Sequence, residues 1–82
     1  MPAWTKLQPN GTVKVYAKNV VGAGIAQIFV NGKEIAWVNT SDVNDPKLFN
    51  GYLVRTVELA EGKNIIEVFV NGERVRRVAY TK

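Results

Sequence analysis

The phrase Ile28-Phe29-Val30-Asn31-Gly32 returns forty residues later as Val68-Phe69-Val70-Asn71-Gly72. The likeness extends outward, because Gly22 matches Gly62 and Val38 matches Val78 at the same spacing. A fixed period of this length indicates an internal duplication. Each copy has room for only three short strands, so the two copies together predict one small all-β domain rather than a solenoid.

Apolar and polar residues alternate through most of the chain, and no stretch shows the 3.6-residue period of a helix. Residues 12–18 and 53–59 alternate in this way, although Arg55 interrupts the apolar face of the second stretch. Turn signals rich in Asn and Gly separate the stretches. We therefore expect six to seven short strands in a single domain over residues 1–82, folded as a sandwich or barrel.

Each Asn-Gly pair predicts a tight hairpin turn of type I′, because both central residues of that turn need positive φ. In the first hairpin such a turn sets Ile28 opposite Ile35 and the small Ala26 opposite Trp37. This register places the Trp37 ring in the core, and we expect Trp37→Ala to cost roughly 3–5 kcal/mol. Trp4, near the free end, is then the exposed indole.

The second hairpin needs an irregularity. Its plain register pairs Glu67 with Arg76 and Phe69 with Arg74, but it also places Arg77 on the core face. A β-bulge at Arg76-Arg77 removes this conflict and returns the residues that follow, Val78 and Tyr80, to the inner face.

The composition removes most catalytic chemistry. The chain has no His and no Cys, and Ser41 is its single serine, so a Ser-His-Asp triad and a histidine or thiolate zinc site are impossible. No phosphate-binding glycine loop is present. Asp42, Asn44 and Asp45 offer oxygens to calcium but lack the spacing of a calcium loop, and Asx-turns explain them more simply. We expect no enzyme, no metal and no cofactor.

The net charge is +4, and residues 73–82 concentrate it in three arginines and Lys82 against Glu73 alone. A basic end suits nucleic acid, an anionic membrane or an acidic protein, but Arg and Lys also protect an edge strand from aggregation. We favour the edge strand, since no aromatic stripe accompanies the charge as single-stranded nucleic acid binding requires. No apolar run approaches the ~18 residues of a membrane span, and no signal-peptide core precedes the domain.

Residues 57–70 carry a pattern that resembles a known family. Apolar residues alternate from Val57 to Val70, Glu61-Gly62 and Asn64 interrupt them, and the Asn31-Gly32 turn precedes the pattern. This pattern resembles the bacterial immunoglobulin-like modules of the glucodextranase type, and the likeness covers residues 11–81. It implies an immunoglobulin-like β-sandwich in which the repeat is the pseudo-symmetry of two strand–hairpin halves. Such modules pass between the halves in a few residues, whereas residues 39–51 make a long connection here, of the kind that tends to carry function.

Aromatic side chains provide the candidate binding surface. Phe29 and Phe69 occupy repeat-matched positions, and by parity both point away from the core, with Arg74 beside Phe69. Aromatics and arginine are enriched in protein interfaces, although aliphatic stems can also simply cover such rings. Tyr16 is a further outward aromatic. The candidate protein-binding residues are Phe29, Phe69, Arg74, Phe49 and Tyr52.

These features predict a non-catalytic structural domain that binds other proteins. The start at Met1-Pro2 without a signal favours a small phage virion subunit, capsid-decorating or tail-associated, bound to capsid or tail proteins and assembled in the host cytoplasm. The family resemblance favours instead an accessory module of a secreted bacterial enzyme or adhesin, extracellular and attached to parent-chain domains. A tryptophan on such a sandwich can also stack on a sugar, so carbohydrate binding stays a third alternative.

Overall fold

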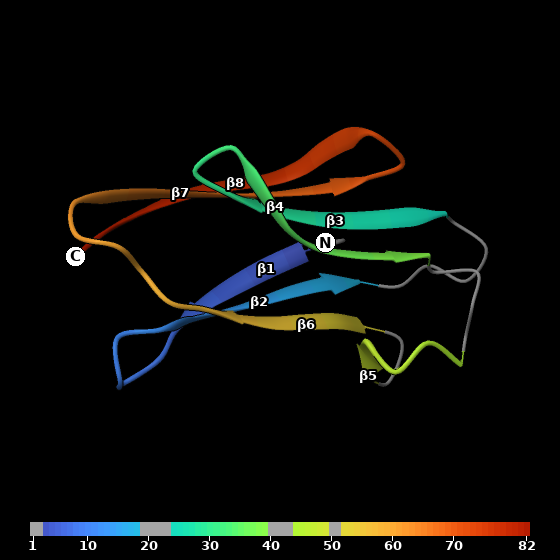
Figure 1. Ribbon diagram of the computed structural model, residues 1–82, viewed down its shortest axis with the longest axis horizontal. Helices are drawn as coiled ribbons and strands as arrows, with labels where there is room; N and C mark the ends of the chain where they lie inside the picture. The colour runs from blue at the N-terminus through green and yellow to red at the C-terminus, as the bar shows by residue number, and fades with distance from the viewer. Residues whose placement is uncertain (1–2, 19–23, 40–43, 50–51) are drawn as a thin grey trace.

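A computed structural model describes residues 3–18, 24–39, 44–49 and 52–82. These residues form eight strands in two antiparallel four-stranded sheets that face each other (Figure 1). Sheet A has the order β1 (Ala3–Leu7), β2 (Val13–Lys18), β6 (Tyr52–Val57) and β5 (Leu48–Phe49). Sheet B has the order β4 (Lys33–Asn39), β3 (Ile25–Val30), β7 (Lys63–Val70) and β8 (Glu73–Thr81).

The predicted all-β sandwich is confirmed. The described residues form eight strands rather than six to seven, because the two-residue strand β5 forms inside the expected long connection. The basic strand β8 lies at the edge of sheet B, where its charge pattern placed it. Within the described ranges, no helix is long and apolar enough to cross a membrane.

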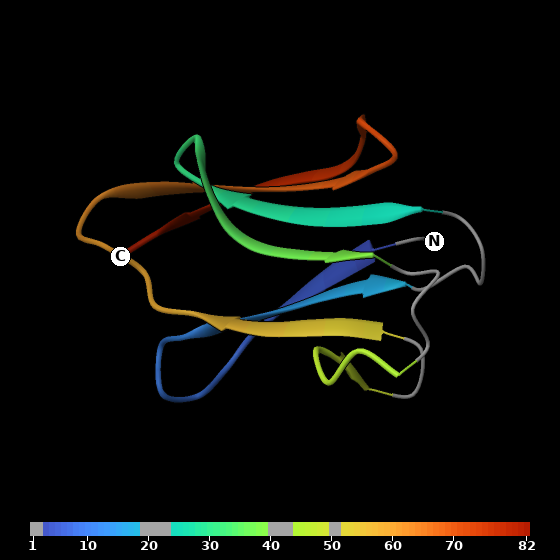
Figure 2. The same ribbon diagram turned by 45° about the vertical axis from the view of Figure 1, so that its right-hand side comes forward.

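The two halves of the chain are interleaved around a pseudo-twofold axis. Ile28 lies opposite Val68 where β3 pairs with β7, and Val15 lies opposite Arg55 where β2 pairs with β6. Both pairs join residues forty positions apart. Each sheet therefore takes its two central strands from different halves, and neither half has a core of its own (Figure 2).

The core lies between the sheets. Every strand except β5 and β8 contributes a buried hydrophobic residue, and these two strands pack partly buried side chains against the core. The alternation expected in β2 is observed, and in β6 it holds for Leu53 and Val57 while Arg55 stays exposed. The buried hydrophobic residues are Ala3, Val13, Val15, Ala17, Ala26, Ile28, Val38, Leu53, Val57, Leu59, Ile66 and Val68.

Both Asn-Gly turns have the predicted conformation, with φ of 52° and 81° at Asn31 and Gly32 and of 52° and 78° at Asn71 and Gly72. Positive φ at both central positions is the requirement of a type I′ turn. Each hairpin then contains a β-bulge at the same repeat position, opposite Ile28-Phe29 in the first and Val68-Phe69 in the second. The duplication therefore extends to the irregularities of the strands.

The first bulge overturns the predicted position of Trp37. Ile35 is the extra residue, so Trp37 lies opposite Gln27 rather than Ala26. The indole therefore faces outward and is 42% exposed. Val38 takes the buried position opposite Ala26 instead, because a shift of one residue moves every later side chain to the other face. Trp4 is exposed, as expected.

The second bulge exists but lies at Val75, one residue before the predicted position. Val78 and Tyr80 do pack against the core. The predicted pairing of Glu67 with Arg76 is wrong, because Glu67 lies opposite Arg77 and Arg76 lies opposite Val68 on the inner side of the sheet. In the described part of the chain, the Nε atom of Arg76 is buried without a hydrogen-bond partner.

The connection from β6 to β7 carries the chain from one sheet to the other and is organised by Asn64, which is fully buried. The Asn64 side chain accepts the Ala60 N–H at 2.9 Å and donates to the carbonyls of Ala60 and Gly62 at 2.8 and 3.0 Å. A buried amide needs such partners, because an unpaired polar group in the interior is costly. Asn64, which belongs to the sequence pattern of residues 57–70, therefore stabilises this connection.

Candidate functional site

The five candidate residues lie on the two opposite outer faces of the sandwich. Phe29, Phe69 and Arg74 share the outer face of sheet B. Phe69 of β7 lies opposite Arg74 of β8 on one side and opposite Gln27 of β3 on the other, and Phe29 follows Gln27 by two residues on the same face of β3. Phe49 lies opposite Tyr52 in sheet A. The structure thus brings together the first three and, separately, the last two.

The Phe surface consists of Phe29 and Phe69 with the polar residues around them. The two half-buried rings meet edge to face, with centroids 5.2 Å apart and planes at 72°. They touch along a diagonal of the ladder, because Phe29 lies opposite Glu67 and Phe69 opposite Gln27. The prediction that both rings point away from the core is confirmed, and the contact between them contributes about 0.5–1.5 kcal/mol.

Two repeat-matched polar pairs border the Phe surface. Gln27 Nε2 donates to Glu34 Oε2 at 2.6 Å, and Arg74 Nη1 donates to Glu67 Oε2 at 3.2 Å. Glu67 and Arg74 stand forty residues after Gln27 and Glu34. The surface therefore has an aromatic centre and a polar rim, which is the usual arrangement of a protein interface.

The Trp surface covers the outer face of sheet A and includes two of the predicted residues, Phe49 and Tyr52. Trp4 stacks on Tyr16 with centroids 4.8 Å apart and meets the Tyr52 ring edge to face at 5.3 Å. Phe49 is 69% exposed and lines a shallow hollow with Lys14, Tyr16 and Val54. Sequence reasoning did not join Trp4 to this group, although pairing β1 with β2 by parity would have placed Trp4 next to Tyr16.

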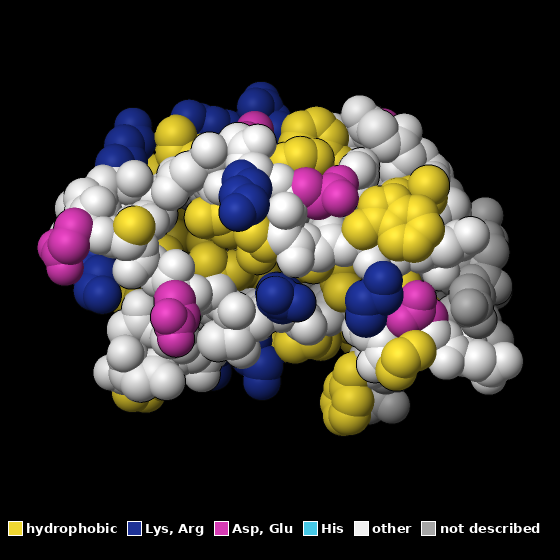
Figure 3. Space-filling view, viewed as in Figure 1, with side chains coloured by type: hydrophobic (Ala, Val, Ile, Leu, Met, Phe, Trp, Pro, Cys, Tyr) yellow, Lys and Arg dark blue, Asp and Glu magenta, His cyan; other side chains and the backbone are white. Residues whose placement is uncertain are grey.

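A groove separates β4 from β5 and β6 at the front edge of the sandwich. Figure 3 shows hydrophobic side chains between charged ones on this side, in the space between the two sheets. The groove has a volume of about 500 Å³. Its lining residues are Glu34, Ile35, Ala36, Trp37, Pro46, Lys47, Phe49, Leu53, Val54 and Arg55.

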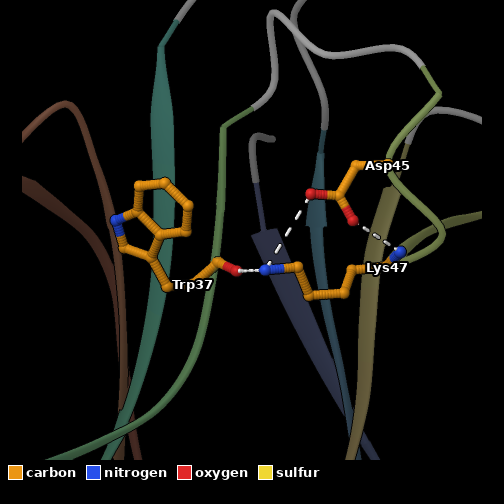
Figure 4. A network of polar contacts seen from close by, with 3 residues as sticks. All are labelled: Trp37, Asp45 and Lys47. Carbon is orange, nitrogen blue, oxygen red and sulfur yellow. Dashed lines mark hydrogen bonds and ion pairs between the residues drawn. The ribbon is translucent and has the colours of Figure 1, made fainter.

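Lys47 lines this groove and links the long connection to β4 (Figure 4). Its Nζ donates to the Trp37 carbonyl, lies 5.2 Å from the centroid of the Trp37 ring and is 3.9 Å from Asp45 Oδ2. Asp45 Oδ1 also accepts the Lys47 N–H at 2.9 Å, which is the expected Asx-turn. Asp42, the first of the oxygen-bearing candidates, lies outside the described residues.

Comparison with protein-family models, with curated proteins and with solved structures found no match for this chain. The geometry of the two aromatic surfaces and of the groove therefore carries the functional argument.

Proposed function

We propose that this chain is a non-catalytic structural domain that binds other protein subunits through aromatic surfaces on its outer faces. The observation that carries the proposal is that contacting aromatic rings occupy the outward positions of both sheets. Contiguous exposed apolar patches with polar borders mark interaction sites on soluble proteins.

The core does not require these rings. An antiparallel sheet with one face in the core usually carries polar residues on its other face. Phe29 and Phe69 stand at such outward positions, and polar side chains occupy the positions opposite them in the β3–β7 ladder. Burial against a partner is a larger gain for two phenylalanines than the single ring contact they make with each other.

Recovery of a partner from the source cells tests the proposal. We expect the purified wild-type domain to retain a defined protein, and Phe29→Ser with Phe69→Ser to lose it while circular dichroism and cooperative unfolding stay close to wild type. Lys63→Ser is the matched control, because it alters an exposed position of β7 on the same face, outside the Phe surface, and keeps both rings. Unchanged recovery by the phenylalanine double variant would remove the Phe surface from the proposal, and its unfolding would assign the rings to the core.

The particular context we propose is a phage particle, in which a small capsid-decorating or tail-associated subunit contacts neighbours on two sides. The opposite placement of the Phe and Trp surfaces supports such a bridging role, and the lack of cysteine suits folding in a reducing cytoplasm. Capsid and terminase genes beside the reading frame are the expected finding. A longer parent chain with a catalytic domain would instead support the accessory immunoglobulin-like module.

Carbohydrate binding is the second candidate, and the outward position of Trp37 favours it. The ring is 42% exposed, and Glu34 and Arg55 in the adjoining groove offer polar groups for sugar hydroxyls. If the domain binds glucans, Trp37→Ala should abolish retention on an insoluble glucan, whereas Trp4→Ala on the opposite sheet should not. Equal behaviour of wild type and Trp37→Ala would exclude this role.

A further inference from the structure

Comparison of the two halves reveals an unpaired edge in sheet A. The outer edge of β2 is covered by β1, whereas the matching edge of β6 is covered only in part by β5. Along β2, strand β1 pairs with every residue from Val13 to Ala17. The matched residues of β6 are 53–57, but β5 pairs only with Leu53 and Tyr52. Among the described residues, no strand therefore pairs with residues 54–57 on this side of β6.

An uncovered edge of this kind offers backbone hydrogen bonds. In an antiparallel strand, alternate residues direct their N–H and C=O groups toward each neighbour. Along residues 54–57 the groups that face away from β2 have no ladder partner in the described structure. Unpaired strand edges are templates for an added strand, which is a recurring mode of peptide recognition.

Among the described residues a groove lies beside this edge, whereas the matching space at the back of the molecule is filled. At the back, β1 lies next to β8, and Thr5 Oγ1 and Tyr80 Oη are hydrogen-bonded at 2.7 Å. One of the inward residues of β8 is Arg76, and its repeat-matched residue in β4 is the small Ala36. Ala36 and Ile35 line the front groove together with Leu53 and Arg55.

The positive charge of Arg55 on the unpaired edge of β6 favours a partner strand with a negative charge. Arg55 stands where the other half has the buried Val15, yet it is exposed, and no ion pair to it is found within the described ranges. A strand added along β6 in the manner of β1 would place one residue directly opposite Arg55, on the groove side. An acidic residue at that point gains a favourable cross-strand pair.

We propose that the open edge of β6 binds an extended acidic segment of a partner protein as an added strand of sheet A. The segment runs antiparallel to β6, with a small or apolar residue opposite Val57 and Asp or Glu opposite Arg55. A second copy of this chain fits less well, because pairing two β6 edges about residue 55 brings two like charges together. This inference extends beyond the proposed function, since it does not involve the Phe surface.

The test uses the peptide Ser-Ala-Trp-Glu-Asp, which copies the start of β1 with glutamate and aspartate in the places of Thr5 and Lys6. It ends opposite Val54, because β5 already pairs with Leu53. Nuclear magnetic resonance of the labelled domain should show that the peptide slows hydrogen exchange at amides within residues 54–57. Arg55→Glu should weaken binding at least tenfold, and a peptide with lysine in place of glutamate should recover the loss. Arg55→Gln, which removes the charge without reversing it, should give an intermediate loss even if the reversal unfolds the domain.

Lys63→Ser is the matched control, because it removes one positive charge at an exposed position of sheet B outside the groove, and it should bind the peptide as the wild type does. The inference is overturned if protection appears along β2 instead of β6, or if the glutamate and lysine peptides bind the wild type equally. It is equally overturned if the free domain dimerises through β6, or if a glucose oligosaccharide binds the groove while the peptide does not.

Discussion

At the residue scale, Asn31 and Asn71 act in two ways at once. Each adopts positive φ in its own turn, and each also binds the strand of the other half. The Asn31 N–H donates to the Ile65 carbonyl at 2.8 Å while Asn31 Oδ1 accepts the Ile65 N–H at 2.9 Å. Asn71 makes the matching pair with Ile25, at 2.8 and 3.0 Å. The turns were predictable from local chemistry, but these bonds were not, because they depend on β3 pairing with β7.

Asn31→Gly and Asn71→Gly separate the two roles. Glycine keeps positive φ but cannot accept the N–H of the facing isoleucine, so each change should cost about 0.5–1.5 kcal/mol. Urea denaturation should give nearly equal losses for the two variants, because their contacts are related by the pseudo-twofold axis. Gly32→Val, which keeps the asparagine but strains the turn, is the complementary control. Wild-type stability in both glycine variants would contradict the cross-strand role.

Trp37 shows that a register shift of one residue decides whether a side chain faces the core or the solvent. The plain hairpin register predicted a buried ring, and the bulge at Ile35 turned it outward. The sequence did contain a signal, because Arg77 is the repeat-matched residue of Trp37 and already required a bulge in the second hairpin. Applying the duplication to irregularities as well as to strands would have placed Trp37 correctly.

Trp37→Ala should therefore cost only about 1 kcal/mol, the ordinary range of a partly exposed site. Ile28→Ala, which removes a fully buried side chain on the pseudo-twofold axis, should cost about 2–5 kcal/mol in the same denaturant titration. A loss of 3–5 kcal/mol at Trp37 would restore the buried position and contradict the bulged register.

At the element scale, the connection from β6 to β7 depends on one buried amide. Asn64→Ala would leave the N–H and C=O of Ala60 without their partner, and we expect a loss of about 1–3 kcal/mol in thermal or urea unfolding. Asn64→Leu keeps a similar volume but offers no hydrogen bonds, so it should be destabilised as well. Recovery of wild-type stability by leucine would mean that packing, not hydrogen bonding, holds this connection.

The long strands were predictable because period-two alternation and Asn-Gly turns are local signals. The expected stretch 12–18 contains β2 (Val13–Lys18), and the expected 53–59 overlaps β6 (Tyr52–Val57). Strand β5 was not predictable, since two residues carry no alternation. The order of strands within each sheet was equally beyond reach, because alternation says which face is inward and not which strand is the neighbour.

At the scale of the whole molecule, the candidate residues lie on two different sheets, and local alternation predicts the face of a side chain but not the sheet to which its strand belongs. Parity correctly placed Phe29 and Phe69 on one outer face, where their rings touch. Assigning Phe49 and Tyr52 to the opposite sheet required the sheet topology. Among the described residues, the short strand β5 leaves an edge of β6 unpaired, which no local pattern in the sequence reveals.

Site-specific photo-cross-linking in the source cells tests the proposed binding role most directly. A benzophenone amino acid replaces Phe69 on the Phe surface, Tyr16 on the Trp surface or, as a control, the exposed Glu61 in the connection between the sheets. Irradiation should join position 69 to a protein of one defined mass, with a product from position 16 if the domain bridges two neighbours and none from position 61. No product from either aromatic surface, or the same products from position 61, would contradict a protein-binding role for these faces.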